Sequence, residues 1–224
     1  MIDPQLASRI VSMAMRAYPA IIPELSMESW QVFRAASGYD GIRNTYWAEI
    51  YDAVEGYLTS DKPVTSFKNA MKRAMVEAFG GATDLGYEEV GGEPPLDDDT
   101  LAWLNAQVDQ ESGFIDDLFA KLKKSDGLDP IDEAFARADG YTKTLDAIYA
   151  EAKMRGDKNK ILEWELGETE KHCSTCSNLN GQKHKASWYI SRNYIPKKPN
   201  ADMECKGYNC DCRLKDKNGN EVTI

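Results

Sequence analysis

Five cysteines in the last quarter of the chain are the residues best suited to chemistry. Cys173 and Cys176 form a CxxC pair, Cys210 and Cys212 form a second close pair, and Cys205 lies just before the second pair. A CxxC turn presents two thiolates to one ion, and a second pair brought in across a loop completes four tetrahedral sulfur ligands for Zn²⁺. The spacing therefore predicts a zinc site. A CxxC redox centre, a disulfide clasp and unrelated buried thiols are the alternatives.

The two histidines are further candidates for the same site. His172 adjoins the first cysteine pair and His184 lies beyond the Asn180-Gly181 turn, so either could replace one thiolate in a Cys3His site. A hydrolytic zinc keeps an open position beside a carboxylate base, and neither HExxH nor the HxE and PCxxC pattern of zinc deaminases occurs in the sequence. Four sulfur ligands would leave no position for water. The zinc is therefore expected to be structural, and the chain is not expected to be an enzyme.

The net charge of −10 is unevenly distributed along the chain. Residues 84–139 contain sixteen acidic and four basic side chains, whereas residues 171–217 contain ten basic and four acidic ones. The acidic excess argues against wrapping nucleic acid with the whole surface. The basic segment also carries aromatic side chains, which would either stack on single-stranded nucleic acid or cover a small zinc module in place of a core. These aromatic and basic residues are Trp188, Tyr189, Tyr194, Tyr208, Lys183, Lys185, Arg192, Lys197, Lys198 and Lys206.

Apolar residues at helical spacing occupy most of the first three quarters of the chain. Gly80-Gly81 is expected to end one of the helices, and Gly140 is a candidate break in another. The acidic run at residues 97–99 predicts a capped helix start, because carboxylates favour the positive end of the helix dipole. The apolar stripes run over residues 6–17, 42–57, 67–79, 101–122 and 131–148.

The pattern changes to apolar and acidic alternation at residues 161–166, which predicts a strand with Leu162, Trp164 and Leu166 on one face. Asn180-Gly181 follows as a turn of hairpin type. This C-terminal part is too small for a core of its own, so a metal would stabilise it. The sequence predicts a mainly α fold with two domains. A helical domain covers residues 1–158, and a small β-rich, zinc-ribbon-like module covers residues 159–224.

A set of motifs covers roughly the last fifty residues. A tryptophan strand ends at residues 164–167, the CxxC turn follows it, a Leu-Asn-Gly turn occupies residues 179–181, and residues 205–214 form a closing element with three cysteines. This order resembles the C-terminal module of tailed-bacteriophage minor head proteins, which are also called head morphogenesis proteins. The closing element of that family usually carries a residue such as Arg where this chain has Asp211. Many members also have a histidine-proline before the last cysteines, where this chain has Cys205 nearby.

The resemblance implies that Cys173, Cys176, Cys210 and Cys212 are the metal ligands, with Cys205 as the reserve candidate. It also implies a structural or assembly component of a tailed-phage virion, present in multiple copies per particle, that binds portal, capsid or neck proteins. A zinc-ribbon protein that contacts packaged DNA through its basic C-terminal segment is the alternative function.

The start of the chain lacks the basic and apolar regions of a secretory signal. No apolar run approaches the roughly 20 residues that span a bilayer. The chain is therefore expected to be made in a cytoplasm, without a membrane partner. The resemblance implies that this is the host cytoplasm and that the chain is carried in the virion.

Overall fold

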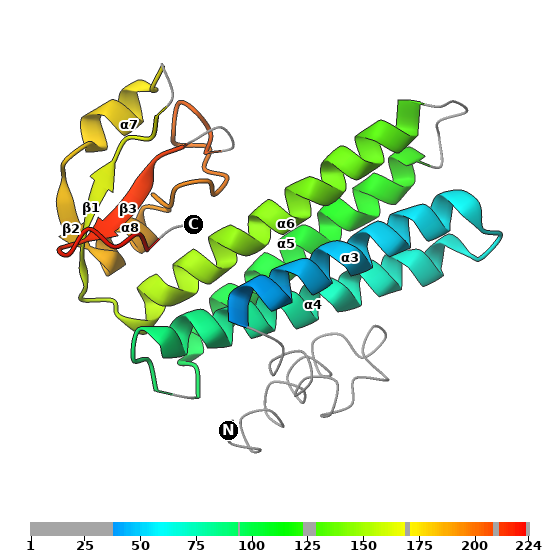
Figure 1. The fold of residues 1–224 in the computed structure, drawn as a ribbon, viewed down its shortest axis with the longest axis horizontal. Helices are drawn as coiled ribbons and strands as arrows, with labels where there is room; N and C mark the ends of the chain where they lie inside the picture. Colours follow the sequence, from blue (N-terminus) through cyan, green and yellow to red (C-terminus); the bar gives the residue numbers. More distant parts are fainter. Residues whose placement is uncertain (1–37, 94, 123–128, 169–170, 208–210, 223–224) are drawn as a thin grey trace. The chain divides into compact units, whose positions relative to one another are not determined.

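The computed structural model describes residues 38–93, 95–122, 129–168, 171–207 and 211–222. Long helices are followed by a small three-stranded antiparallel sheet near the C-terminal end (Figure 1). The predicted mainly α fold with a small β module is confirmed. The helix expected at residues 6–17 lies outside the described residues. None of the helices in the described part of the chain has an apolar stretch long enough to cross a membrane.

The chain folds into two compact units. The first contains the described residues from 38 to 82 and from 97 to 142, and the second contains those from 83 to 96 and from 143 onwards. The second unit thus includes the ends of two long helices as well as the sheet. The domain boundary predicted between residues 158 and 159 stays a prediction.

Four of the predicted apolar stripes lie on long helices. These helices are α3 (Gly38–Thr59), α4 (Val64–Glu89), α5 (Asp98–Leu122) and α6 (Asp129–Gly156). In α3 the stripe is buried from Ile42 to Val54, and Tyr46 and Ile50 are fully enclosed. The acidic run before α5 provides the expected cap, because an Asp97 carboxylate oxygen accepts a hydrogen bond from the backbone N–H of Thr100 at 2.7 Å.

The prediction that Gly80-Gly81 ends a helix is wrong. Both glycines are buried inside α4, which continues to Glu89. A glycine in a helix interior costs roughly 1 kcal/mol relative to alanine. Burial of the flanking Phe79 and Ala82, both 0% exposed, offsets that cost. The candidate break at Gly140 is also absent, because α6 passes through it.

The end of α4 comes at a second glycine pair. Gly91 has a φ of +87°, a left-handed conformation that glycine adopts without a steric penalty. The N–H groups of Gly91 and Gly92 donate to the carbonyls of Glu88 and Tyr87, each at 3.0 Å. This pattern is a Schellman cap, which satisfies carbonyl groups that the end of the helix would leave unpaired.

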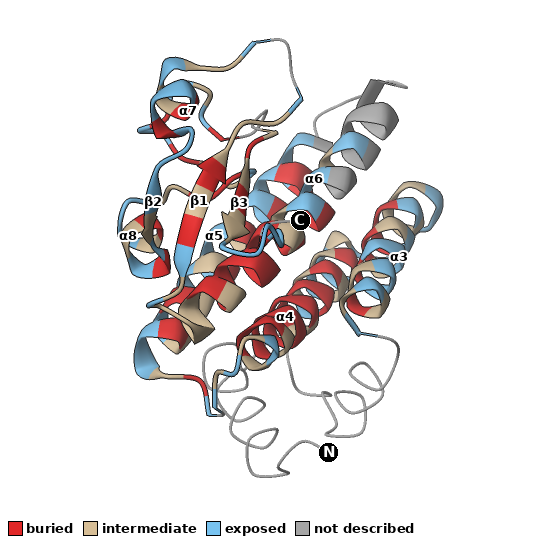
Figure 2. Cartoon of the chain, turned by 60° about the vertical axis from the view of Figure 1, so that its left-hand side comes forward, coloured by how far each residue is buried: buried red, intermediate tan, exposed pale blue. Residues whose placement is uncertain are grey.

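The sheet of the second unit has the strand order β2-β1-β3, from β2 (Lys183–Lys185), β1 (Ile161–Glu165) and β3 (Arg213–Asp216). The predicted strand at residues 161–166 is confirmed as β1, with Leu162 opposite His184 and Trp164 opposite Leu214. Leu162 and Trp164 are 0% exposed, and Figure 2 shows buried residues in the central strand. The alternating pattern therefore identified the face that packs into the core.

Asn180-Gly181 forms a turn, but the turn does not join two strands. It connects the short helix α7 (Ser174–Leu179) to β2. Gly181 has a φ of +76°, and its N–H donates to the carbonyl of Trp164 at 2.8 Å. The turn thus fixes the end of α7 against the central strand.

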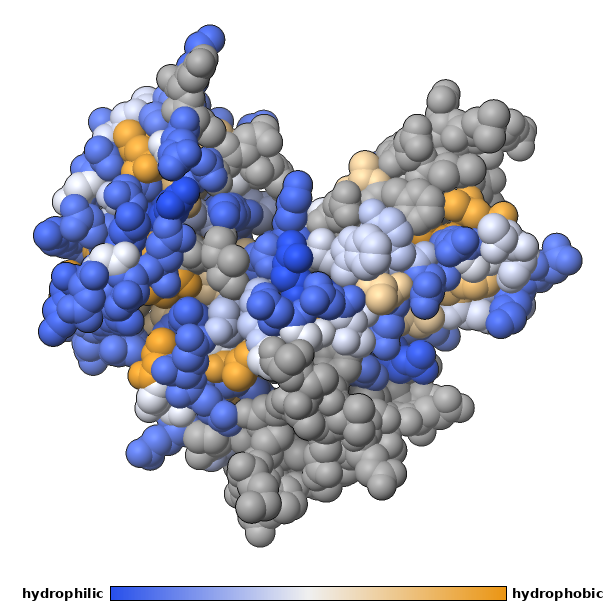
Figure 3. Space-filling view, in the orientation of Figure 1, coloured by the Kyte–Doolittle hydropathy of each residue, from blue (hydrophilic) through white to orange (hydrophobic). Residues whose placement is uncertain are grey.

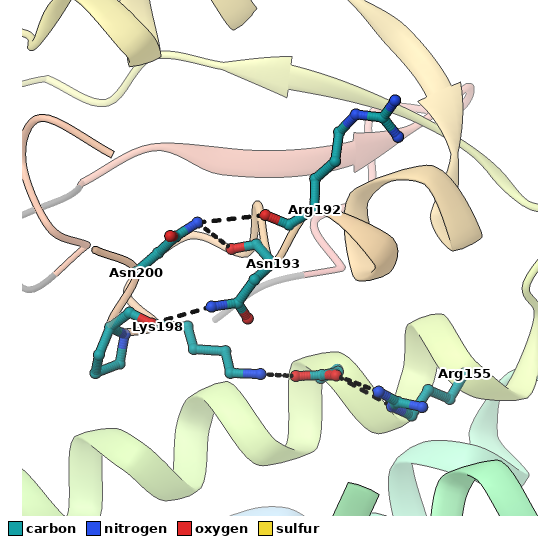
Figure 4. A network of polar contacts seen from close by, with 7 residues as sticks. Arg155, Arg192, Asn193, Lys198 and Asn200 are labelled. Carbon is teal, nitrogen blue, oxygen red and sulfur yellow. Dashed lines mark hydrogen bonds and ion pairs between the residues drawn. The ribbon is translucent and has the colours of Figure 1, made fainter. Parts of the chain in front are cut away.

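A buried carboxylate connects α6 to a loop of the second unit. Glu151 is 2% exposed, and it accepts hydrogen bonds from Arg155, at 3.1 and 2.7 Å, and from the Lys198 ammonium. Close by, the side-chain amide of Asn200 donates to the carbonyl of Asn193 at 2.8 Å. Figure 4 shows these contacts. The Lys198–Glu151 ion pair joins the loop at residues 193–200 to the helix, and the Asn200 bond holds the loop itself together.

A second buried carboxylate lies in the first unit. Glu111 on α5 is 6% exposed, and burial raises its pKa to about 7. Burial, followed by the negative charge of Glu111, raises the pKa values of Tyr46 and Tyr141. The hydroxyl of Tyr46 has no hydrogen-bond partner among the described residues. The folded state therefore favours the protonated form of Glu111.

The raised pKa of Glu111 predicts that the first unit is more stable at mildly acidic pH than at about pH 8. Because the pKa of Glu111 is about 7 in the folded chain and 4.5 in the unfolded chain, the folded state binds more protons between these values. Lowering the pH from about 8 to about 5.5 should raise the free energy of unfolding by about 2 kcal/mol through Glu111 alone. Urea unfolding followed by circular dichroism measures this change.

The matched variants are Glu111→Gln and Glu55→Gln, the second at an exposed position on α3. Glu111→Gln should be more stable than the parent protein at about pH 8 and should lose the part of the pH dependence that Glu111 contributes, whereas Glu77, whose pKa burial also raises to about 7, should contribute the remainder. Glu55→Gln should keep it. An unchanged slope in Glu111→Gln would assign the pH dependence to other groups.

Candidate metal centre

Three cysteine sulfur atoms lie close together in the second unit. The Sγ atoms of Cys173, Cys176 and Cys205 are all within 4.8 Å of one another, and those of Cys176 and Cys205 are 3.9 Å apart. The described cysteines are free, and a disulfide bond would need a separation of about 2.05 Å. These thiols form a group that could hold a metal ion.

The group contains two of the four predicted ligands and the reserve candidate. Cys173 and Cys176 lie together as predicted, and Cys205 joins them. Cys212 is 1% exposed in the hydrophobic core of the unit and is not a member of the three-sulfur group. Cys210 lies outside the described residues. The reserve candidate is therefore brought to the site, while the fourth ligand stays a prediction.

The two histidines are also not members of this group. His184 stacks on Trp188, with ring centroids 3.7 Å apart, and hydrogen-bonds through Nε2 to the side-chain oxygen of Gln182 at 3.0 Å. His172 is half-buried beside the first cysteine pair. Within the described part of the chain, the candidate donor set consists of sulfur atoms.

The first two sulfur atoms are positioned by the start of α7. Cys173 is the N-cap residue, with an extended backbone, and its Sγ accepts a hydrogen bond from the N–H of Cys176 at 3.3 Å. The N–H of Ser177 bonds to the carbonyl of Cys173 at 3.0 Å. The CxxC segment thus turns directly from extended chain into helix, which places the two side chains on the same side.

The third sulfur atom comes from a tight loop at residues 200–207. The N–H of Lys206 donates to the carbonyl of Met203, and the N–H of Asn200 donates to the carbonyl of Lys206. Met203 is 1% exposed and anchors the loop in the core. Gly207 has a φ of +80°, and a Cβ atom there would lie 1.9 Å from the carbonyl oxygen of Lys198, so the turn requires glycine.

A carboxylate fastens this loop to the CxxC turn. Glu204 accepts hydrogen bonds from the backbone N–H and the hydroxyl of Ser174, both at 2.7 Å. These bonds lower the pKa of Glu204. The N–H of Glu204 also donates to the Thr175 hydroxyl at 3.4 Å. Because Glu204 immediately precedes Cys205, the contact sets where the third sulfur atom lies.

The surroundings of the thiols also favour the anionic form of Cys173. Burial is the largest single influence and raises the pKa of this thiol, but hydrogen bonds from Cys176 and Cys205 together outweigh it. The pKa therefore lies below its ordinary value. A thiolate is the form that binds metals.

These donors fit a soft ion held tetrahedrally. With Zn–S bonds of about 2.3 Å, tetrahedral sulfur ligands are about 3.8 Å apart. The 3.9 Å separation of the Cys176 and Cys205 sulfur atoms is close to that value. Thiolates also select zinc over hard ions such as Mg²⁺ or Ca²⁺.

Glu204 and Ser174 are the residues of this site that the sequence did not identify. They are thirty positions apart, and no short-range pattern connects an acidic residue in one loop with a serine in another. Their only signal is that each is next to a cysteine. Partners of metal ligands are found in this way only after the chain is folded.

We expect Glu204→Ala to weaken metal binding by the three thiols about 10- to 100-fold, because residues that orient metal ligands contribute at this level. The number of metal ions bound at saturation should not change. Competition with a chromophoric chelator measures the affinity. Asp202→Ala is the matched control, since Asp202 is an exposed acidic residue of the same loop. Equal affinities of the two variants would remove the positioning role of Glu204.

The aromatic residues of the basic segment do not form one surface. Tyr189 is 0% exposed, and its hydroxyl donates to the carbonyl of Gln182 at 2.9 Å. Trp188 and Tyr194 are half-buried and pack against the same core, and Tyr208 lies outside the described residues. Tyr189 therefore fits the interpretation that the aromatic rings pack in this small module in place of a larger core, and it is not available for stacking on nucleic acid.

Comparison with known proteins adds no identity to this geometry. No protein-family model, no curated protein and no solved structure matches the chain.

Proposed function

We propose that the second unit is a structural zinc module. Cys173, Cys176 and Cys205 would hold the ion, and the fourth ligand would come from the closing element, as Cys210 or Cys212. The ion supplies no reaction in this proposal. It cross-links the CxxC turn, the loop at residues 200–207 and the closing element. The observation that carries the proposal is the close grouping of three thiols from two separate segments.

Metal analysis of the purified chain tests this part. Elemental mass spectrometry should find one zinc per chain, and a chelator should remove it. Because binding energy is folding energy in such modules, hydrogen exchange should then increase in β1, α7 and the loop at residues 200–207. A chain that is fully folded and protected without any metal would contradict the proposal.

We further propose that the chain is a structural or assembly component of a tailed-phage head or its head-to-tail region. The support is the resemblance of the C-terminal motifs to minor head proteins. In addition, three cysteine thiols within those motifs lie close together. Its mechanism would be protein binding. The helices would dock on portal, capsid or neck proteins, and the zinc module would keep the C-terminal fold rigid.

Quantitative mass spectrometry of gradient-purified phage particles tests this role. The chain should be present at a fixed, low ratio to the portal protein and should be much less abundant than the major capsid protein. Absence from particles, with abundance in the lysate, would contradict a place in the virion.

A further inference from the structure

An open groove of about 520 Å³ lies beside β2, at a different place from the thiols. Its walls come from β1, β2 and the short helix α8 (Ala186–Ser191) with the residue after it. No acidic side chain lines the groove. The lining residues used below are Ile161, Lys183, Lys185, His184, Trp188 and Arg192.

Three basic side chains line this groove, which we call the basic groove, and they differ in whether a carboxylate balances their charge. Lys183 forms an exposed ion pair with Glu163 at 3.2 Å. The Lys185 ammonium donates to the amide oxygen of Asn159 at 3.1 Å, which leaves its charge unbalanced. Among the described residues, Lys185 and Arg192 form no ion pair with a carboxylate. Two positive charges are thus held at fixed positions beside the groove and are available to an anionic ligand.

Trp188 holds Arg192 in place but offers little to a nucleic-acid base. The guanidinium carbon of Arg192 lies 4.3 Å from the ring centroid, and the imidazole of His184 lies 3.7 Å from it at an angle of 12°. Two planar groups this close to one ring cannot share a face, so they cover opposite faces of the indole. Single-strand binding proteins use open aromatic faces for stacking. The geometry therefore favours a ligand that uses the charges rather than the ring.

The groove also offers an apolar contact and a strand edge. Ile161 is 49% exposed, although the face of this unit seen in Figure 3 is mainly hydrophilic. β2 is at one edge of the sheet, where it pairs with β1. An extended peptide can lie along such an edge and place alternate side chains in contact with it. A nucleic-acid backbone carries no apolar side chain that would contact Ile161.

We propose that this groove binds an extended acidic segment of a partner protein, in which carboxylates flank an apolar residue. The carboxylates pair with Lys185 and Arg192, and the apolar side chain contacts Ile161. The inference rests on the proposed protein-binding role and names the chemistry of the partner. Its test uses purified chain and no phage particles, so its outcome is separate from that of the particle experiment.

The test is fluorescence anisotropy of the full, metal-loaded chain with labelled peptides. The panel consists of short peptides with aspartates on both sides of a leucine, isoleucine or phenylalanine, and of the same peptides with asparagine in place of aspartate. A single-stranded oligonucleotide is the third kind of probe. The aspartate peptides should bind saturably, with an affinity that falls as salt increases. The asparagine peptides should bind much more weakly.

The Lys185→Gln/Arg192→Gln double variant should weaken binding of the aspartate peptides about tenfold, as expected for two partly exposed charge pairs. Lys143→Gln/Lys217→Gln makes the same change in net charge at two other exposed lysines and should bind like the parent chain. Circular dichroism of both variants checks the fold. No saturable binding to any aspartate peptide would overturn the proposal. Equal weakening in both variants, or groove-dependent binding of the oligonucleotide alone, would also overturn it.

Discussion

Replacing Cys205 by serine should abolish stoichiometric zinc binding and destabilise the second unit. Cys205 supplies the third sulfur atom, 3.9 Å from that of Cys176, and a serine hydroxyl is a poor ligand for a soft ion. A protein at a zinc concentration one hundred times its Kd is stabilised by about 2.7 kcal/mol, so losing the ion should cost at least about that much. Elemental analysis measures the zinc, and urea unfolding monitored in the second unit by hydrogen exchange measures the stability.

Two parallel variants identify the fourth ligand and serve as comparisons. Either Cys210→Ser or Cys212→Ser should lose zinc as Cys205→Ser does, and the other should retain it. Cys212→Ser should lose some stability in both cases, because Cys212 is 1% exposed in the core. If Cys205→Ser keeps one zinc per chain and its full stability, the three-sulfur group is not the metal site.

Replacing Glu151 by glutamine should be the most damaging change away from the thiols. The substitution keeps the shape of the side chain and removes its charge, so the partly buried Arg155 and Lys198 lose their common counter-ion. Breaking a buried ion pair in this way costs about 3–5 kcal/mol. The loop at residues 193–200 should detach from α6 as a result. The measurement is the free energy of unfolding, together with hydrogen exchange at residues 193–207.

Glu163→Gln is the control for this prediction. It removes the same charge from a pair with Lys183 in which both side chains are substantially exposed, and such pairs contribute at most about 1 kcal/mol. Salt should reduce the effect at Glu163 and have little influence at Glu151. Similar small losses in the two variants would mean that the Glu151 network is not a significant part of the stability of the unit.

The three-cysteine group and the Glu151 ion pairs are connected through the loop that carries Lys198. Lys198 carries the ion pair to Glu151, and its carbonyl oxygen is the atom that a Cβ at position 207 would meet at 1.9 Å. The loop that Glu151 fastens is therefore packed against the turn that follows Cys205. Glu151→Gln should consequently lower zinc affinity as well as stability, whereas Glu163→Gln should leave zinc affinity unchanged and lower stability by at most about 1 kcal/mol.

Much of the local structure follows from the sequence, because it depends on neighbours along the chain. Period-3.6 stripes identified the four described long helices, and period-2 alternation identified the central strand and its buried Trp164. The acidic cap before α5 is a contact between Asp97 and Thr100, three positions apart. The continuation of α4 through Gly80-Gly81 was missed, because burial of the helix on both sides outweighs the local preference of glycine.

The sequence by itself determined the CxxC pair and the clustering of all five cysteines between residues 173 and 212, since both depend only on residue type and spacing. Only the tertiary structure decided that Cys205 joins Cys173 and Cys176, because that depends on the Glu204–Ser174 contact between two loops. It also decided that Tyr189 is in the core while Trp188 holds Arg192 at a groove, although the two residues are adjacent. Such assignments depend on which residues meet after folding, and the sequence pattern within one segment carries no information about them.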